Sequence, residues 1–229
     1  MSTILAIETS TELASVALLH RGEFIVHEAL GVNTHSQTIL PMVQILLAQA
    51  GISLAQCDAL AFGAGPGSFT GVRTACGVTQ GLAYGADLPV VPVVTLHAMA
   101  LACREACGAE NVLVVLDARM EEVYWAQYRY QDGWQSIIEP QLSAPSAVNA
   151  NGAAIVCGNA LVAYASAFDK LALATERQAD VVPHARQIAQ LAQIELAAGR
   201  TVGAQDAQPI YLRNKVAFTT AERLARAAA

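Results

Sequence analysis

Charged residues are scarce in this chain: only 14% of its 229 residues are Asp, Glu, Lys or Arg, well below the usual quarter. The formal net charge is −6, so the chain as a whole has no excess of positive charge that would attract nucleic acid. Hydrophobic residues make up 54%, so we expect a partner to cover part of the apolar surface. No apolar run reaches membrane-spanning length and no leader pattern opens the chain, so we expect a soluble, cytoplasmic protein without membrane contact.

Cysteines are few and odd in number, which excludes a complete set of disulfide pairs. Cys103 and Cys107 have helical spacing, but no second pair matches them elsewhere, so a zinc site is not expected. Buried, reduced thiols are the simplest interpretation. The five cysteines are Cys57, Cys76, Cys103, Cys107 and Cys157.

A glycine-rich stretch, residues 63–73, lies between a strand-like run (59–62) and a helix-compatible run (72–84). Such a stretch predicts a tight strand-to-helix turn, with Ser68 or Thr70 as the helix cap. Free amides at a helix start can bind phosphate, and a compact structural turn is the alternative. The nucleotide-binding P-loop ends in Gly-Lys-Ser/Thr, whereas Gly-Val-Arg stands here, so we favour the structural turn.

Glu8 ends the first predicted strand, beside three hydroxyl residues. Its carboxylate could bind a metal-nucleotide, but such side chains favour turns for backbone reasons alone, and we favour the turn. The weak phosphate-loop candidates are therefore Glu8, Thr9, Gly67 and Ser68. We expect no cofactor.

Two helices predicted in the first half of the chain have unusual surfaces. Residues 35–50, ended by Gly51, are apolar over most of the circumference, which suits a helix with two neighbours. The helix after the glycine turn carries Gly77, Gly81 and Gly85 on one side. Glycine destabilises a helix interior relative to alanine, so three of them suggest a packing reason. Either a second protein packs closely against this bare backbone, or another element of the same chain fills the groove along it.

The predicted strand order occurs twice. A buried strand ending in an acid (residues 4–8 or 111–117) is followed each time by two further strands, 13–19 and 24–30, then 122–130 and 134–138. Duplicated α/β lobes of this kind are typical of the actin-like, sugar-kinase-like (ribonuclease-H-like) fold. The two acid-ended turns would then face one cleft.

We divide the chain on this basis into three parts. Residues 1–108 form the first lobe, with the glycine turn and the two helices. Residues 109–213 form a degraded second lobe, closed by 209–213. Residues 214–229 form a helical tail.

Four segments of the chain resemble the TsaB family, whose members are subunits of the bacterial machinery that makes threonylcarbamoyladenosine on tRNA. They are residues 4–11 (ILAIETST), 65–73 (GPGSFTGVR), 116–124 (LDARMEEVY) and 209–213 (PIYLR). Glu8 departs from the aspartate that is more usual in the family.

This resemblance implies a subunit without catalytic residues. TsaB is similar in fold to TsaD, the subunit that transfers threonylcarbamoyl to the adenosine beside the anticodon. TsaD binds its metal through a His-x-x-x-His pair, and the corresponding positions here would be Thr95 and Met99, with His97 alone between them. A single imidazole is not a metal site of this kind, so we expect no metal and no transferase activity alone.

The resemblance also implies partners. TsaB pairs with TsaD through the two helices of the first lobe, a TsaE-like ATPase is the third component, and tRNA is met through the complex. Alone, the same patch would form a homodimer. We expect these interface residues: Thr38, Met42, Ile45, Arg73, Cys76, Gly77, Gln80 and Gly81. A peptidase or a small-molecule kinase of the same fold remains the alternative function.

Overall fold

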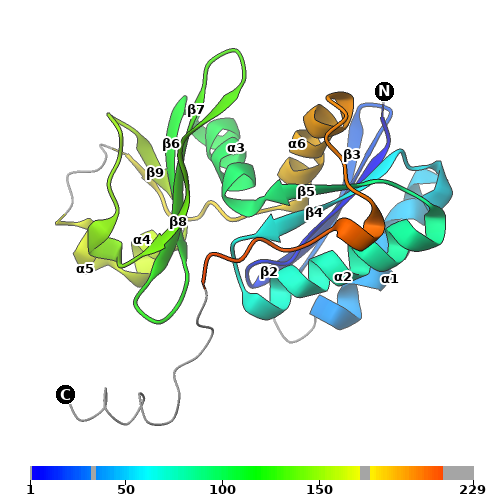
Figure 1. The fold of residues 1–229 in the computed structure, drawn as a ribbon, viewed down its shortest axis with the longest axis horizontal. Helices are drawn as coiled ribbons and strands as arrows, with labels where there is room; N and C mark the ends of the chain where they lie inside the picture. Colours follow the sequence, from blue (N-terminus) through cyan, green and yellow to red (C-terminus); the bar gives the residue numbers. More distant parts are fainter. Residues whose placement is uncertain (1, 32–34, 171–175, 214–229) are drawn as a thin grey trace, which may run out of the picture.

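The computed structural model describes residues 2–31, 35–170 and 176–213, which form two α/β lobes side by side (Figure 1). The first lobe holds a five-stranded sheet of order β3-β2-β1-β4-β5. Its first three strands form an antiparallel meander, and β4 and β5 extend the sheet parallel to β1. The strands are β1 (Ile4–Glu8), β2 (Leu13–His20), β3 (Glu23–Leu30), β4 (Ala59–Gly65) and β5 (Val90–Val94).

The second lobe repeats this arrangement with the order β10-β9-β6-β7-β8. Again three strands form an antiparallel meander and the parallel strands follow, but β9 and β10 have only three and two residues. The strands are β6 (Asn111–Asp117), β7 (Val123–Tyr130), β8 (Trp134–Ser143), β9 (Ile155–Cys157) and β10 (Arg177–Gln178). The predicted α/β class, with two lobes of one strand order and a reduced second lobe, is confirmed.

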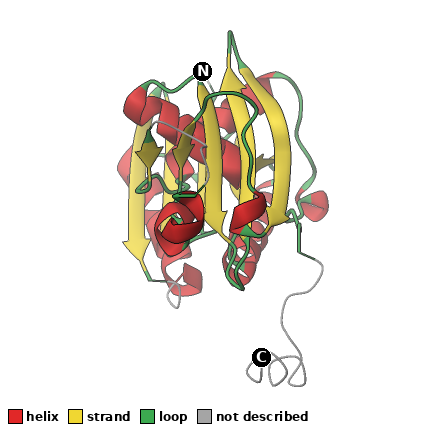
Figure 2. Ribbon diagram, turned by 90° about the vertical axis from the view of Figure 1, so that its left-hand side faces the viewer, coloured by secondary structure: helices red, strands yellow, loops and turns green. Residues whose placement is uncertain are grey.

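Helices cover both faces of the first sheet (Figure 1). Figure 2 turns the molecule by 90°, so that the second lobe lies in front of the first. Helices α1 (His35–Ala50) and α2 (Phe69–Ala86) pack on one face, where Ile39 and Ala75 join the core with Leu5 and Leu18. Helix α3 (Thr95–Cys107) leads from this lobe into the second. No helix in the described ranges is long and apolar enough to cross a bilayer.

The opposite face of the first sheet is covered by a helix from late in the chain, α6 (Ala185–Ala197). The chain then pairs Val202 with Val90 and continues through the short helix η4 (Ala204–Asp206) along α2. Our division placed all of this in the second lobe. A helical pattern in this segment could not show which sheet the helix would cover.

One predicted boundary differs from the structure, because strand β8 runs five residues further than expected, to Ser143. Residues 160–168 contain two short helices, α4 (Ala160–Ala163) and α5 (Ala165–Phe168). Two further 3-10 turns are η2 (Leu54–Gln56) and η3 (Pro145–Ala147). The predicted tail 214–229 lies outside the described residues.

Candidate partner-binding face and interlobe cleft

The glycine turn between β4 and α2 is held against the turn that follows β1. The amide of Ser68 donates to the Ser10 carbonyl (2.7 Å), and Thr9 Oγ1 donates to the Gly71 carbonyl (2.7 Å). A Cβ atom added at Gly71 would overlap the Thr9 carbonyl oxygen, and one at Gly67 would clash with Ser10. The glycines at these positions are therefore explained by close contact between two backbones.

Ser68 is the cap of α2, as expected, because its hydroxyl accepts the Gly71 amide (3.4 Å). Helix α2 begins earlier than expected, at Phe69, so the alternative cap Thr70 lies inside the first turn. Thr70 instead offers its carbonyl to the Thr74 hydroxyl (3.0 Å).

Glu8 is completely buried behind this turn. Its carboxylate accepts the Ser10 amide and the Thr95 hydroxyl (3.3 Å), and an added Cβ at Gly63 would overlap it. Burial raises the pKa of Glu8. Of the four weak phosphate-loop candidates, Glu8 and Thr9 thus serve the packing of the turn, and only Gly67 and Ser68 line the interlobe cavity.

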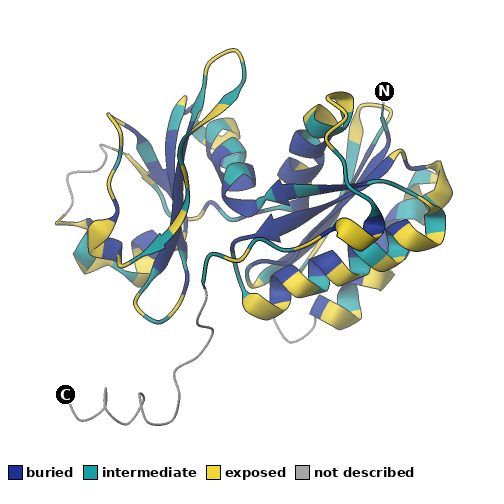
Figure 3. Ribbon diagram, in the orientation of Figure 1, coloured by how far each residue is buried: buried dark blue, intermediate teal, exposed yellow. Residues whose placement is uncertain are grey.

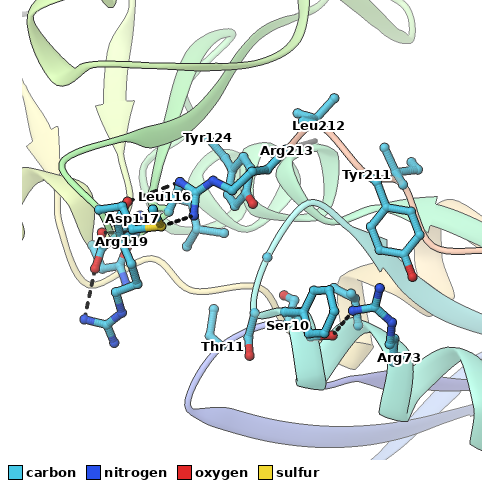
Figure 4. Close-up of a pocket in the computed structure, with 18 of the residues that line it drawn as sticks. Ser10, Thr11, Arg73, Leu116, Asp117, Arg119, Tyr124, Tyr211, Leu212 and Arg213 are labelled. Carbon is cyan, nitrogen blue, oxygen red and sulfur yellow. Dashed lines mark hydrogen bonds and ion pairs between the residues drawn. The ribbon is translucent and has the colours of Figure 1, made fainter. Parts of the chain in front are cut away.

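The two lobes enclose a cavity of about 770 Å³ (Figure 4). Four segments form most of its lining: residues 10–12 after β1, residues 67–69 with 72 and 73 at the start of α2, residues 116–120 at the end of β6, and residues 210–213. Tyr124 and Asn159 complete the lining. The prediction that the turns after β1 and β6 face one cleft is confirmed. Residues 209–213 were expected to close the second lobe, but the Ile210 amide donates to the Ala64 carbonyl of the first lobe (2.7 Å).

Most charges in the cleft are paired. Arg119 lies 3.1 Å from Asp117 and 3.4 Å from Glu12 across the cleft. Arg213 pairs with Glu122 and donates to the Arg119 carbonyl (3.2 Å). These bonds hold a turn in which Arg119, Met120 and Glu121 all have positive φ angles, at 60°, 59° and 61°. Left-handed backbone is costly for such residues, so Arg213 stabilises an otherwise unfavourable turn.

The cleft mouth carries an aromatic–cation stack, drawn in Figure 4. The Arg73 guanidinium lies 3.3 Å from the Phe69 ring centroid and 4.8 Å from that of Tyr211. Both rings are about half exposed. Arg73 also donates to the Phe69 carbonyl (3.0 Å), which helps to hold its side chain at the cleft mouth.

We call the exposed outer surface of the two helices, marked by Leu40, Ile45, Gly77, Gly81 and Tyr84, the α1–α2 face (Figure 3). The Leu40 and Ile45 side chains are 44% and 49% exposed, and Tyr84 is 81% exposed. A Cβ added at Gly77, Gly81 or Gly85 meets no atom of the described chain within 4 Å. The alternative that the chain's own elements fill the glycine groove is therefore wrong for the described residues.

The expected interface residues divide into two groups. Ile45, Arg73, Gly77 and Gly81 are exposed, and Thr38 is partly buried. The other three are engaged by the chain itself: Met42 and Cys76 are buried in the first core, and Gln80 Nε2 donates to the Ala207 carbonyl (2.9 Å). Cys76 Sγ donates to the same carbonyl (3.4 Å). Sequence patterns did not reveal this contact, because Ala207 contributes only backbone.

His97 is held by aromatic side chains of the second lobe. Its ring stacks on Tyr128 at a centroid distance of 4.8 Å and meets Trp134 edge-on at 5.4 Å. Thr95 accepts the Gly65 amide (3.1 Å), and Met99 is completely buried. These three positions therefore pack the junction between the lobes. Burial lowers the pKa of His97 to about 4, partly offset by Glu195.

Replacing His97 by Phe is expected to reduce the decrease in the free energy of unfolding as the pH is lowered. The folded-state pKa of about 4 lies below the ordinary histidine value of 6.5, so the folded protein disfavours the imidazolium. The neutral His97 ring therefore contributes fully to the free energy of unfolding above pH 6.5. This contribution is lost as the pH falls toward 4, by up to about 3 kcal/mol. Urea unfolding of the native protein and of H97F from pH 7.5 to 4 measures the free energy of unfolding at each pH. The same fall with pH in both proteins would contradict the prediction. Glu8 acts with the opposite sign in both proteins, since its raised pKa favours folding at lower pH.

Comparison with known proteins gives consistent matches. The family described as "TsaD: tRNA N6-adenosine threonylcarbamoyltransferase" matches residues 27–222. The tRNA threonylcarbamoyladenosine biosynthesis protein TsaB of Haemophilus influenzae is 45% identical, covering 94% of this chain and 95% of its own, and that of Escherichia coli is 40% identical, covering 94% and 96%. The solved structure "YeaZ from Pseudomonas aeruginosa" matches with a TM-score of 0.85 and 40% identity, over 93% of this chain and all of its own. The chain belongs to the TsaB family of tRNA threonylcarbamoyladenosine biosynthesis proteins, within the wider family that the TsaD description names.

Proposed function

We propose that this protein is a non-catalytic subunit in the formation of threonylcarbamoyladenosine on tRNA, and that it binds and activates a TsaD-type transferase through the α1–α2 face. The observation that carries this proposal is the open glycine ridge of α2, beside exposed apolar side chains of α1. A helix without side chains along one side lets another helix approach its backbone closely. Exposed apolar surface of this kind marks protein contact sites.

The size of the face suits a stable contact. Helices of 16 and 18 residues are about 24 and 27 Å long. Two such helices side by side offer a platform of the scale at which protein pairs associate specifically, about 800 Å² per partner. The exposed Arg73 and Tyr84 belong to residue types enriched at the energetic centres of interfaces.

The engaged polar residues support the proposal that the chemistry belongs to the partner. Thr95 donates to Glu8, Thr9 donates to the Gly71 carbonyl, and His97 contacts two aromatic rings. Each of them would have to leave a packed position to hold a nucleotide or a metal. A polar group that serves packing is poorly placed to change partners during catalysis.

Further associations follow from this role. A TsaE-type ATPase joins the pair, tRNA is met through the assembled complex, and two copies of this chain pair through the α1–α2 face when the transferase is absent. Both associations of the face compete, because they use the same surface.

Reconstitution tests the proposed function. The TsaD-type subunit is supplied with threonylcarbamoyl-adenylate and a tRNA bearing the target adenosine, with and without this protein. We expect no transfer by this protein alone, and faster transfer by the TsaD-type subunit once it is added. Transfer by this chain alone, or an unchanged rate in the mixture, would refute the proposal.

The isolated protein is also expected to bind no catalytic metal and to turn over no ATP. Among the described residues, no group of three His, Cys, Asp or Glu side chains is arranged to hold a metal ion. Metal binding is measured by elemental analysis after incubation with iron or zinc and desalting. ATP turnover is measured as phosphate release. One metal per chain, or steady ATP hydrolysis with a small-molecule acceptor, would instead favour an enzyme of the same fold.

A further inference from the structure

Three of the five cysteines gather at the end of helix α3, in the core of the second lobe. The sulfur atoms of Cys103 and Cys107 lie 3.9 Å apart, one helical turn from each other. Cys157, the last residue of β9, also hydrogen-bonds the Cys103 side chain. Cys57 and Cys76 lie in the separate core of the first lobe.

Within this cluster, the three sulfur atoms differ in access. Cys103 and Cys157 are completely buried, whereas Cys107 is partly exposed. The hydrogen bonds from Cys157 and Cys107 lower the pKa of Cys103, which favours its thiolate. Burial raises the pKa of Cys107 and of Cys157. An oxidant from solvent therefore meets Cys107, and a nucleophilic sulfur lies directly behind it.

We propose that Cys103 and Cys107 form a reversible redox-modification site, which hydrogen peroxide converts to a disulfide. The Cys107 thiol, which solvent can reach, loses its proton and attacks one peroxide oxygen; the O–O bond breaks, and a sulfenic acid forms as hydroxide leaves. The Cys103 thiolate then attacks the Cys107 sulfur, the S–S bond forms, and the second hydroxide leaves. Both thiols are oxidised, the peroxide is reduced, and two waters result.

The end of α3 allows the required movement. A disulfide needs its sulfur atoms at about 2.05 Å, so the two sulfur atoms must approach. Cys107 is the last residue of α3, and Gly108 follows it in the left-handed conformation, with φ of 75°. The last turn of a helix opens more easily than its middle. Closing the disulfide therefore disturbs only the end of the helix, and strain in the bridge keeps it reducible.

The sequence makes the test unambiguous. Trypsin cuts after Arg104, Arg119, Arg129 and Lys170, so Cys103, Cys107 and Cys157 fall on three peptides: 74–104, 105–119 and 130–170. The full chain is treated with a small excess of hydrogen peroxide, alkylated after unfolding and mapped by mass spectrometry. We expect free thiols to fall from five to three, with peptides 74–104 and 105–119 joined and separated again by dithiothreitol.

Two variants complete the experiment. Cys76 shares a peptide with Cys103, so the bridge must persist in C76S. In C107S, all remaining thiols are expected to stay free under the same treatment. A bridge between Cys103 and Cys157, or Cys103 and Cys107 as alkylatable as Cys57 after peroxide, would overturn the proposal. Neither outcome depends on the TsaD-type partner, so this test is separate from that of the proposed function.

Discussion

Replacing Gly77 or Gly81 by Leu is expected to lower the affinity of this protein for a TsaD-type subunit by about 100-fold, which corresponds to about 2.7 kcal/mol. A leucine side chain on the ridge would hold the partner helix away from the α2 backbone. The fold itself is expected to tolerate the change, because an added Cβ meets nothing within 4 Å in the described chain. Isothermal titration with the purified transferase subunit measures the affinity.

The matched control is Ala197→Leu, which adds leucine at an exposed position of α6, away from the α1–α2 face. It should leave the affinity unchanged. Circular dichroism and urea unfolding should show all three variants folded as the native protein is. Native-like affinity in both glycine variants would rule out the ridge as the contact.

Replacing Gly71 by Ala is expected to destabilise the protein by about 3 kcal/mol or more, although the change adds one methyl group. The new Cβ would overlap the Thr9 carbonyl oxygen, and both partners of the clash are held by hydrogen bonds. Neither backbone can move away without breaking the turn against which the cleft is built. Urea unfolding at pH 7.5 measures the effect as a lower midpoint.

Gly77→Ala provides the matched control in the same helix. Its Cβ enters open space, and alanine is a better helix former than glycine, so this variant should gain about 0.5–1 kcal/mol. The two substitutions are chemically identical and should have opposite signs. A loss at Gly77 similar to that at Gly71 would mean that the ridge packs within the chain.

Local patterns were enough to predict several individual elements of both lobes. Helix α1 has the bounds expected from its apolar content and the glycine that ends it. The cap of α2 also follows from local chemistry, because a hydroxyl in front of a helix satisfies an orphan amide. Strand β7 alternates as its sequence suggests: Val123 and Trp125 face one core, and Tyr124 and Tyr128 face the other.

Contacts between distant segments were not predictable in this way. The apolar side of α6 suits either sheet, and only the structure places it on the first. The contact of α2 with Ala207 depends on a backbone carbonyl, which any residue would supply. Residues 210–213 line the cleft for the same kind of reason, because a backbone bond between Ile210 and Ala64 directs them there. Hydrogen bonds to backbone atoms do not depend on the residue type, so the sequence does not reveal them.

Part of the predicted interface is engaged by the chain itself. Met42 and Cys76 lie on the two helices that the TsaB resemblance implied as the contact, and both side chains are buried. Helical position now separates them from their neighbours, since both point toward the first core. Ile45 and Gly77, on the same two helices, remain exposed.

Hydrogen exchange of this protein, with and without the TsaD-type subunit, tests most directly whether the α1–α2 face is where the partner binds. Exchange should slow in peptides that cover 35–50 and 69–86, and should stay unchanged in those covering the edge strand β8 (Figure 1). Unchanged exchange in both helices, with slowing elsewhere on the molecule, would contradict the account.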